Sequence, residues 1–285
     1  MTNNPTIDAA GTAEEDGSIG IFDSGVGGLT VLRQIQAIMP SENLIYFADQ
    51  AHVPYGPRPD GEVQRFSLEI SRFLIEHGAK IIVVACNTAS AAALDFLRRS
   101  MAEVAFVGME PAIKPGAGET QNGRVGVLAT VGTFDSQRYA SLMTRFARKV
   151  TVYEDPCLGL VEQIEAGELD SPETKRILSN ALMPMSRENV DTLVLGCTHY
   201  PFVLPLIKQL AGPGVRVIDP APAVARQTLR VLEERNLLIR SDSRGTLTAF
   251  TSGDPEIFAN SIPKLLELQM PVSQANWISG TLTIS

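Results

Sequence analysis

The chain has 285 residues, 44% of them hydrophobic, so it is long enough to fold into two compact domains with a core in each. Lys and Arg total 24 against 32 Asp and Glu, and no basic run forms a phosphate-binding stripe, which argues against a nucleic-acid partner. Three widely spaced cysteines are typical of a reducing compartment, the cytoplasm, rather than of a disulfide framework.

The first stretch, residues 1–17, is polar and acidic, and we expect it to form a flexible leader. It lacks the apolar core of a signal peptide. No later apolar run reaches the length of about 18 residues that a membrane span requires. The sequence therefore predicts no association with a membrane.

After this leader, short apolar runs rich in β-branched residues alternate with amphipathic stretches of helical period. This alternation is typical of an α/β protein whose mostly parallel sheets are covered on both faces. Helices are expected over 62–77, 136–148 and 223–234. The predicted strands are 19–22, 44–47, 81–85, 104–108, 125–129, 150–153, 192–196, 215–219 and 246–251.

Landmarks recur in the same order about a hundred residues apart, which indicates an internal duplication. The run 19–22 has a counterpart in 125–128, and Cys86 has one in Cys197. We expect two similar α/β domains related by a pseudo-twofold, with the active site in the cleft between them. The predicted first domain is 18–113 plus 222–285, and the second is 114–221.

The duplicated cysteines are the most informative feature. Cys86 and Cys197 each follow an expected strand and precede a helix start, with Asn87 or Thr88 as the cap of the first helix. There the helix dipole is expected to lower the pKa of a thiol below roughly 8.5. Either thiol alone is more simply a core residue, as we expect for Cys157. The pair instead favours two bases facing one substrate, which remove a proton from one face of a carbon and return it to the other.

The loop between the first strand and its helix has glycines that partly mimic a dinucleotide fingerprint. Free N–H groups at such a helix start attract anions. Thr30 replaces the third glycine, however, and Asp23 would point a negative charge at a phosphate. A nucleotide site is therefore disfavoured.

The remaining candidates argue against a metal or a cofactor. His199 lies two residues from Cys197, close enough to exchange a proton with it, but the Cys-Thr-His spacing is too short for the usual zinc pairs. Pyridoxal phosphate needs a lysine for its Schiff base. Lys80 and Lys149 precede strands at the wrong edge of the sheet, and the other lysines fall in helices or connections. We expect neither a metal nor a cofactor.

Four motifs spread along the chain resemble those of glutamate racemases, in the cofactor-independent aspartate/glutamate racemase family. They are DSGVGGL at 23–29, VPYGPR at 53–58, ACNTA at 85–89 and GCTHYP at 196–201. The resemblance implies a cleft that holds L- or D-glutamate, no cofactor, and supply of D-glutamate for peptidoglycan in the cytoplasm. It also implies a homodimer.

The resemblance further implies roles for individual residues. One cysteine thiolate removes the α-proton while the other thiol protonates the opposite face, with Cys86 acting on D-glutamate and Cys197 on L-glutamate. Asp23 and His199 assist the nearby thiols. The residues implied to hold the substrate are Asp23, Ser24, Tyr55, Gly56, Asn87, Thr88, Thr130, Thr133, Thr198 and His199.

Three alternatives remain open at this point. They are a racemase for aspartate or another acidic amino acid, a single-cysteine decarboxylase or isomerase, and a two-lobed binding protein without chemistry. The second cysteine argues against a single-thiol enzyme and against a pure binder. Glu162 is kept outside the site, and the tail after Leu268, which contains Trp277, carries no prediction.

Overall fold

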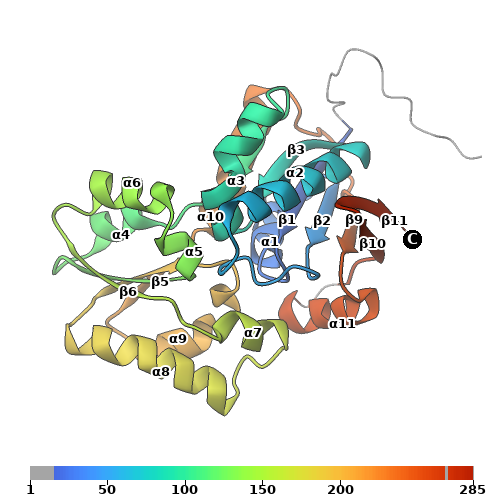
Figure 1. Cartoon of the computed structure of the whole chain (residues 1–285). Helices are drawn as coiled ribbons and strands as arrows, with labels where there is room; N and C mark the ends of the chain where they lie inside the picture. The colour runs from blue at the N-terminus through green and yellow to red at the C-terminus, as the bar shows by residue number, and fades with distance from the viewer. Residues whose placement is uncertain (1–15, 267–268, 285) are drawn as a thin grey trace, which may run out of the picture.

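The computed structural model describes residues 16–266 and 269–284, so nearly all of the leader predicted at 1–17 lies outside the described residues. The strands form two separate sheets, with helices on both faces of each (Figure 1). Within the described residues, the single antiparallel pair is β10–β11. The predicted α/β class with mostly parallel sheets is confirmed.

The larger sheet has the strand order β11-β10-β9-β2-β1-β3-β4. Its strands are β1 (Ser18–Asp23), β2 (Leu44–Ala48), β3 (Ala79–Val84), β4 (Phe106–Gly108), β9 (Leu247–Thr251), β10 (Val272–Ile278) and β11 (Thr281–Ile284). The chain leaves this sheet after β4 and returns to it with β9, which pairs with β2.

The smaller sheet has the order β6-β5-β7-β8. Its strands are β5 (Arg124–Ala129), β6 (Thr151–Asp155), β7 (Thr192–Gly196) and β8 (Arg216–Ile218). This order repeats the β2-β1-β3-β4 order of the larger sheet, as an internal duplication predicts. The domain limits at 113/114 and 221/222 stay predictions.

The helices alternate with the strands along the chain. They are α1 (Leu29–Ile38), α2 (Asp60–Glu76), α3 (Asn87–Ser100), α4 (Ile113–Glu119), α5 (Val131–Phe134), α6 (Gln137–Phe146), α7 (Leu160–Glu165), α8 (Pro172–Arg187), the 3₁₀ turn η1 (Tyr200–Val203), α9 (Leu204–Ala211), α10 (Ala221–Glu234) and α11 (Pro255–Leu266).

The apolar strands are continuous rather than alternating because both faces of each sheet are buried. In β3, Ile81 and Val83 face the cluster under α1 and α10, whereas Ile82 and Val84 face the cluster under α2 and α3. The first of these clusters continues into the smaller half, where it packs beneath α7, α8 and α9. A third cluster lies under α4 and α6. The halves therefore share one apolar layer.

The sequence predicted no structure after residue 268, but β10 and β11 form a hairpin there. Its two-residue turn, Ser279-Gly280, has φ of 52° and 88°, as a type I′ turn requires. A two-residue turn of this kind is a short-range signal that sequence reasoning overlooked. The hairpin extends the larger sheet beyond β9.

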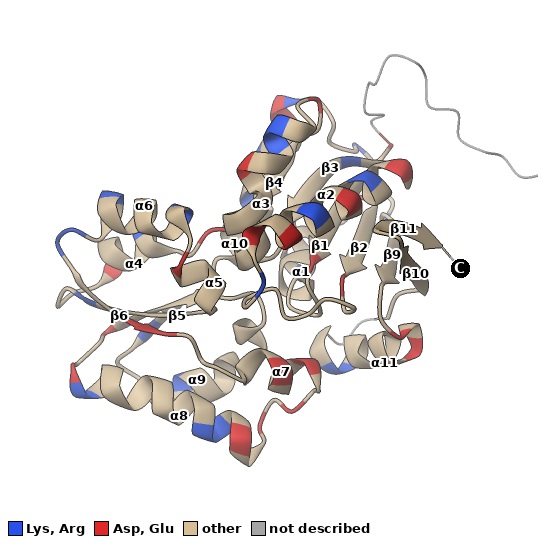
Figure 2. Cartoon of the chain, viewed as in Figure 1, with Lys and Arg blue, Asp and Glu red and all other residues tan. Residues whose placement is uncertain are grey.

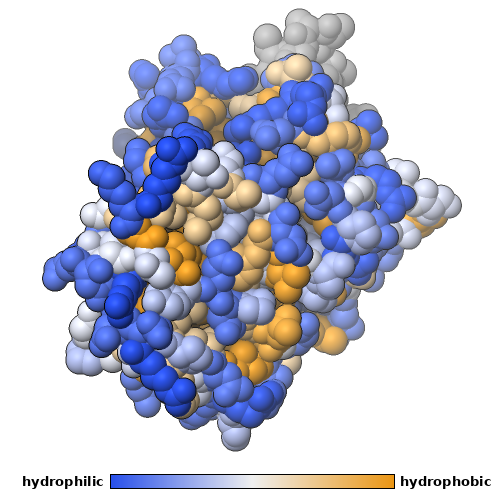
Figure 3. All heavy atoms as spheres, turned by 60° about the vertical axis from the view of Figure 1, so that its left-hand side comes forward, coloured by the Kyte–Doolittle hydropathy of each residue, from blue (hydrophilic) through white to orange (hydrophobic). Residues whose placement is uncertain are grey.

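The surface is mixed in charge and polarity. Figure 2 shows Lys and Arg interspersed with Asp and Glu along α2, α3 and α8. On the face in Figure 3, hydrophobic residues form small, separate patches in a mainly hydrophilic surface. None of the described helices combines the length and apolarity that crossing a membrane demands.

One buried ion pair fixes the turn before β2. Lys80 Nζ lies 2.8 Å from Glu42 Oε2, and both side chains are almost fully buried. The other carboxylate oxygen accepts a hydrogen bond from the Ile239 N–H at 2.7 Å. The pair thus ties β3 to the segment that leads from α10 to β9.

We expect Lys80→Met to destabilise the protein by about 3–5 kcal/mol, because it leaves the Glu42 carboxylate buried without its cation. Urea unfolding followed by circular dichroism measures the loss. Arg176→Met is the matched control, since it breaks an exposed pair with Glu173 and should leave the midpoint almost unchanged. Equal effects of the two substitutions would contradict a structural role for the buried pair.

Candidate functional site

A small pocket lies between the two sheets, at the carboxyl ends of their parallel strands. Ligands of open α/β sheets bind at this edge because the loops that follow the strands gather there. The lining residues are Ser24, Pro54, Tyr55, Gly56, Cys86, Asn87, Thr88, Thr130, Val161, Gly196, Cys197, Thr198 and His199. Both duplicated cysteines therefore line one pocket, one from each sheet.

Cys86 is the N-cap of α3, a position that the sequence assigned to Asn87 or Thr88. Its Sγ accepts a hydrogen bond from the Ala89 N–H at 3.4 Å. The expectation that the helix start lowers the pKa of this thiol is wrong. Burial raises the pKa of Cys86 far above its usual value, and the nearby Asp23 carboxylate raises it further, outweighing the helix N–H groups. Cys86 is therefore a protonated thiol at neutral pH.

Asp23 ends β1 and is fully buried. Its carboxylate accepts hydrogen bonds from the Gly25 N–H at 2.8 Å and from Thr198 Oγ1 at 2.9 Å. Burial raises the pKa of Asp23, although His199 and these donors oppose the shift. Asp23 does not line the pocket itself and instead links the β1 loop to the loop after β7.

The second thiol has a different neighbour. Cys197 Sγ lies 3.7 Å from His199 Nδ1, and His199 Nε2 lies 2.6 Å from Glu165 Oε1. Burial alone lowers the pKa of His199, but its contacts with Cys197 and Glu165 carry it well above the usual value. Burial alone raises the pKa of Glu165, yet His199 outweighs it and the pKa is lowered. The imidazolium form of His199 is thus favoured, with Cys197 Sγ on one side and the Glu165 carboxylate on the other.

Glu165 is a site residue that the sequence did not predict. It lies at the end of α7 and reaches the other half, where it accepts hydrogen bonds from the Val26 N–H at 2.8 Å and from Gln50 Nε2 at 3.3 Å. A Cβ at Gly25 would lie 1.8 Å from its Oε1, so a larger residue there would displace the Glu165 carboxylate from its partners. An acid in the last turn of a helix opposes the helix dipole, so this conflict would have drawn attention to Glu165 had a helix over Leu160–Glu165 been predicted.

The other predicted residues divide into two groups. Ser24, Tyr55, Gly56, Asn87, Thr88, Thr130 and Thr198 line the pocket, whereas Thr133 does not. Thr133 Oγ1 lies 3.1 Å from Thr130 Oγ1, which in turn lies 2.8 Å from Thr88 Oγ1. This chain of hydroxyls joins the two halves beside the pocket. Pro54, Val161 and Gly196 line the pocket without having been predicted.

The Asn87 side chain is 3% exposed and faces the pocket, yet neither its amide nitrogen nor its oxygen has a hydrogen-bond partner among the described residues. Buried polar atoms in folded proteins are nearly always paired. An amide with one donor group and one acceptor suits a polar ligand that carries both. No group of three or more His, Cys, Asp or Glu in the described ranges is arranged to hold a metal.

Comparison with known proteins places this geometry in context. A family model described as Asp/Glu/hydantoin racemase matches residues 28–228. Glutamate racemase from Pseudomonas aeruginosa is 51% identical over 253 residues, which cover 89% of this chain and 95% of that protein. Glutamate racemase from Francisella tularensis, solved in complex with D-glutamate, matches with a TM-score of 0.80 and 30% identity, covering 93% of this chain and 98% of that chain. Glutamate racemase from Escherichia coli, solved with L-glutamate and the activator UDP-MurNAc-Ala, matches with a TM-score of 0.80 and 31% identity, covering 94% and 99%.

We expect Glu165→Gln to lower the pKa of His199, because it removes the anion that offsets the cost of burying the imidazolium. The alkaline limb of any activity that needs the imidazolium should move to lower pH. With only three histidines in the chain, ¹⁵N NMR of labelled imidazoles resolves the titration. Glu162→Gln, on the exposed side of the same helix, is the control. A shift of equal size in the control would show that Glu165 has no special role.

Proposed function

We propose that this chain, which belongs to the Asp/Glu/hydantoin racemase family, interconverts L- and D-glutamate without a cofactor. The observation that carries the proposal is that Cys86 and Cys197, from two different sheets, line one small pocket. Two acid–base groups on opposite sides of a carbon are what inversion by proton transfer requires. The glutamate complexes of two structural relatives identify the substrate class.

The residues around the thiols suit an amino acid with two carboxylates. The unpaired amide of Asn87 supplies donors to a carboxylate, and the hydroxyls of Thr88, Thr130 and Thr198 lie around the same space. The start of α3 adds backbone N–H groups that favour an anion. We propose that these groups, with Ser24 and the Tyr55-Gly56 turn, hold the two carboxylates and the ammonium.

The two thiols have opposite environments, which suits one base and one acid. The His199 imidazolium stabilises negative charge on Cys197 Sγ, whereas Cys86 keeps its proton. With L-glutamate, Cys197 takes the α-proton as the Cα–H bond breaks, and the electron pair moves into the adjacent carboxylate. Cys86 then gives its proton to the opposite face of Cα, which forms D-glutamate and leaves a Cys86 thiolate. The reverse reaction exchanges the roles.

The weak acidity of the α-hydrogen is the main chemical obstacle. Negative charge that develops on the substrate carboxylate must meet donors already in place, because water is excluded from such a site. The amide of Asn87 is almost fully buried and has no partner among the described residues, so its hydrogen bonds to the substrate act in a medium of low dielectric constant. We propose that the Asn87 amide stabilises this charge, and that Thr198, which donates to Asp23, fixes the loop beside it.

The biological setting is also a proposal. D-Glutamate is a component of peptidoglycan, so we propose that the protein supplies that precursor. All three cysteines are free and buried, which suits the reducing cytoplasm. The family resemblance favours a homodimer, and sedimentation velocity on the purified protein tests that assembly.

We expect Cys86→Ala and Cys197→Ala each to lower kcat for racemisation at least about a hundredfold, since each removes one proton-transfer group. Circular dichroism of both glutamate enantiomers, with no cofactor added, measures the rate. Glutamate binding, followed by calorimetry, should be largely retained. Cys157→Ala is the control, because this third buried cysteine lies outside the pocket lining and its loss should leave kcat unchanged.

In D₂O, two-base chemistry places deuterium in the product enantiomer before the remaining substrate, because the donor thiol carries a deuteron from the solvent. Full turnover by either single variant would exclude the two-cysteine mechanism. An unchanged ligand in the wild-type reaction would indicate a binding protein. Faster racemisation of aspartate than of glutamate would assign the other acidic substrate.

A further inference from the structure

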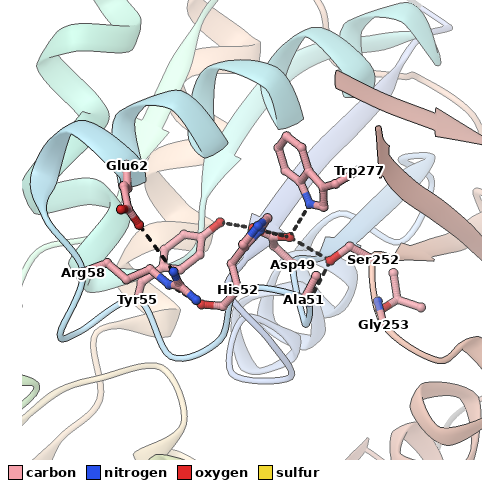
Figure 4. A network of polar contacts seen from close by, with 10 residues as sticks. Asp49, Ala51, His52, Tyr55, Arg58, Glu62, Ser252, Gly253 and Trp277 are labelled. Atoms are coloured by element: carbon pink, nitrogen blue, oxygen red, sulfur yellow. Dashed lines mark hydrogen bonds and ion pairs between the residues drawn. The ribbon is translucent and has the colours of Figure 1, made fainter. Parts of the chain in front are cut away.

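Asp49 follows β2 and is fully buried, yet its carboxylate is surrounded by donors from distant parts of the chain (Figure 4). Oδ2 accepts a hydrogen bond from Tyr55 Oη at 2.6 Å and lies 2.9 Å from His52 Nδ1. Oδ1 accepts from Ser252 Oγ at 2.7 Å and from Trp277 Nε1 at 2.8 Å. The His52 Nδ1 also lies 3.1 Å from Oδ1, so each carboxylate oxygen has at least two partners.

We propose that Asp49 and Trp277 are positioning residues that hold the Tyr55-Gly56 turn against the pocket, so that the C-terminal hairpin helps to set the affinity for substrate. This inference rests on the proposed function, because Tyr55 and Gly56 line the pocket assigned to glutamate. Neither positioning residue lines the pocket. They act through the Tyr55 hydroxyl.

The outer side of this loop is held by a group of aromatic rings. The His52 ring stacks on Phe66 of α2 with centroids 3.8 Å apart, and Trp277 meets both rings edge-on at 5.1 and 5.6 Å. Arg58 Nε donates to the His52 carbonyl oxygen at 2.6 Å, which closes the loop on itself (Figure 4). Trp277 thus contributes both an N–H donor and a packing surface to the same loop.

The inner side of the loop has little room to move. A Cβ at Gly56 would lie 3.2 Å from Thr130 Cβ, and a Cβ at Gly132 would lie 2.6 Å from the Gly56 carbonyl oxygen. The turn is therefore fitted between the Asp49 carboxylate and the start of α5. A change at Asp49 must shift Tyr55-Gly56 relative to the pocket, because the other half blocks any compensating movement inward.

Asp49→Asn is the sharpest test. An amide nitrogen cannot accept a hydrogen bond, and each carboxylate oxygen has at least two partners, so either orientation of the amide disrupts at least two contacts. We expect KM for glutamate, and the calorimetric Kd, to rise about tenfold or more, as the loss of a hydrogen bond to a charged group implies. We expect kcat to change less than about twofold, since the thiols are untouched.

Trp277→Phe keeps an aromatic ring and removes one donor, so we expect a rise in KM of about threefold. Tyr55→Phe removes the hydroxyl through which the network acts. If the inference is correct, Trp277→Phe changes KM by less than about twofold when Tyr55 is already phenylalanine. Tyr153→Phe is the matched control, because it breaks a phenol–carboxylate hydrogen bond with Glu188 away from the pocket.

Three results would overturn the inference: an unchanged KM and Kd in both Asp49→Asn and Trp277→Phe, a loss of kcat at constant KM, or an undiminished effect of Trp277→Phe in the Tyr55→Phe background. If Asp49→Asn does not fold, Trp277→Phe and the double variant decide. Racemisation by the wild-type protein tests the proposed function separately. If that activity is absent, the calorimetric Kd values for glutamate still decide the positioning role.

Discussion

The site depends on the contacts of the Glu165 carboxylate, because they join the two halves of the molecule at the pocket. From the end of α7 it bonds His199 in its own half and the backbone N–H of Val26 in the other. This position aims His199 Nδ1 at Cys197, and a side chain at Gly25 would push the carboxylate away from it. Orientation of the imidazole and protonation of its ring thus follow from one ion pair, and the hydrogen bond to Val26 adds a link between the halves.

The duplication makes the site symmetric in topology, but the electrostatics around the two thiols differ. Cys197 has a cationic neighbour in His199, whereas Cys86 has the Asp23 carboxylate nearby. The same strand–turn–helix position therefore yields a protonated thiol on one side and a charge-stabilised sulfur on the other. One sulfur that stabilises negative charge and one that keeps its proton supply the base and the acid that inversion at a carbon requires.

The sequence predicted the nine strands β1–β9 and most of the pocket, because apolar runs mark buried strands and their carboxyl ends converge. The raised pKa of Cys86 was not predictable, since it reflects burial by segments distant in the chain. Glu165 was missed for the same reason, because its partner Val26 is far away in sequence. The role of Trp277 was not predictable either, because its indole N–H donates to Asp49, which is far away in the sequence.

The apolar layer shared by the two halves limits how far they can move apart. Residues such as Ile21, Leu160 and Leu195 belong to one continuous cluster that runs from α1 to α8. Moving the halves apart would expose this layer to water, which is unfavourable by a free energy of about 25 cal/mol for each Å² of apolar surface exposed. A wide hinge motion is therefore unfavourable, and we expect glutamate to reach the thiols through small displacements of the loops that line the pocket.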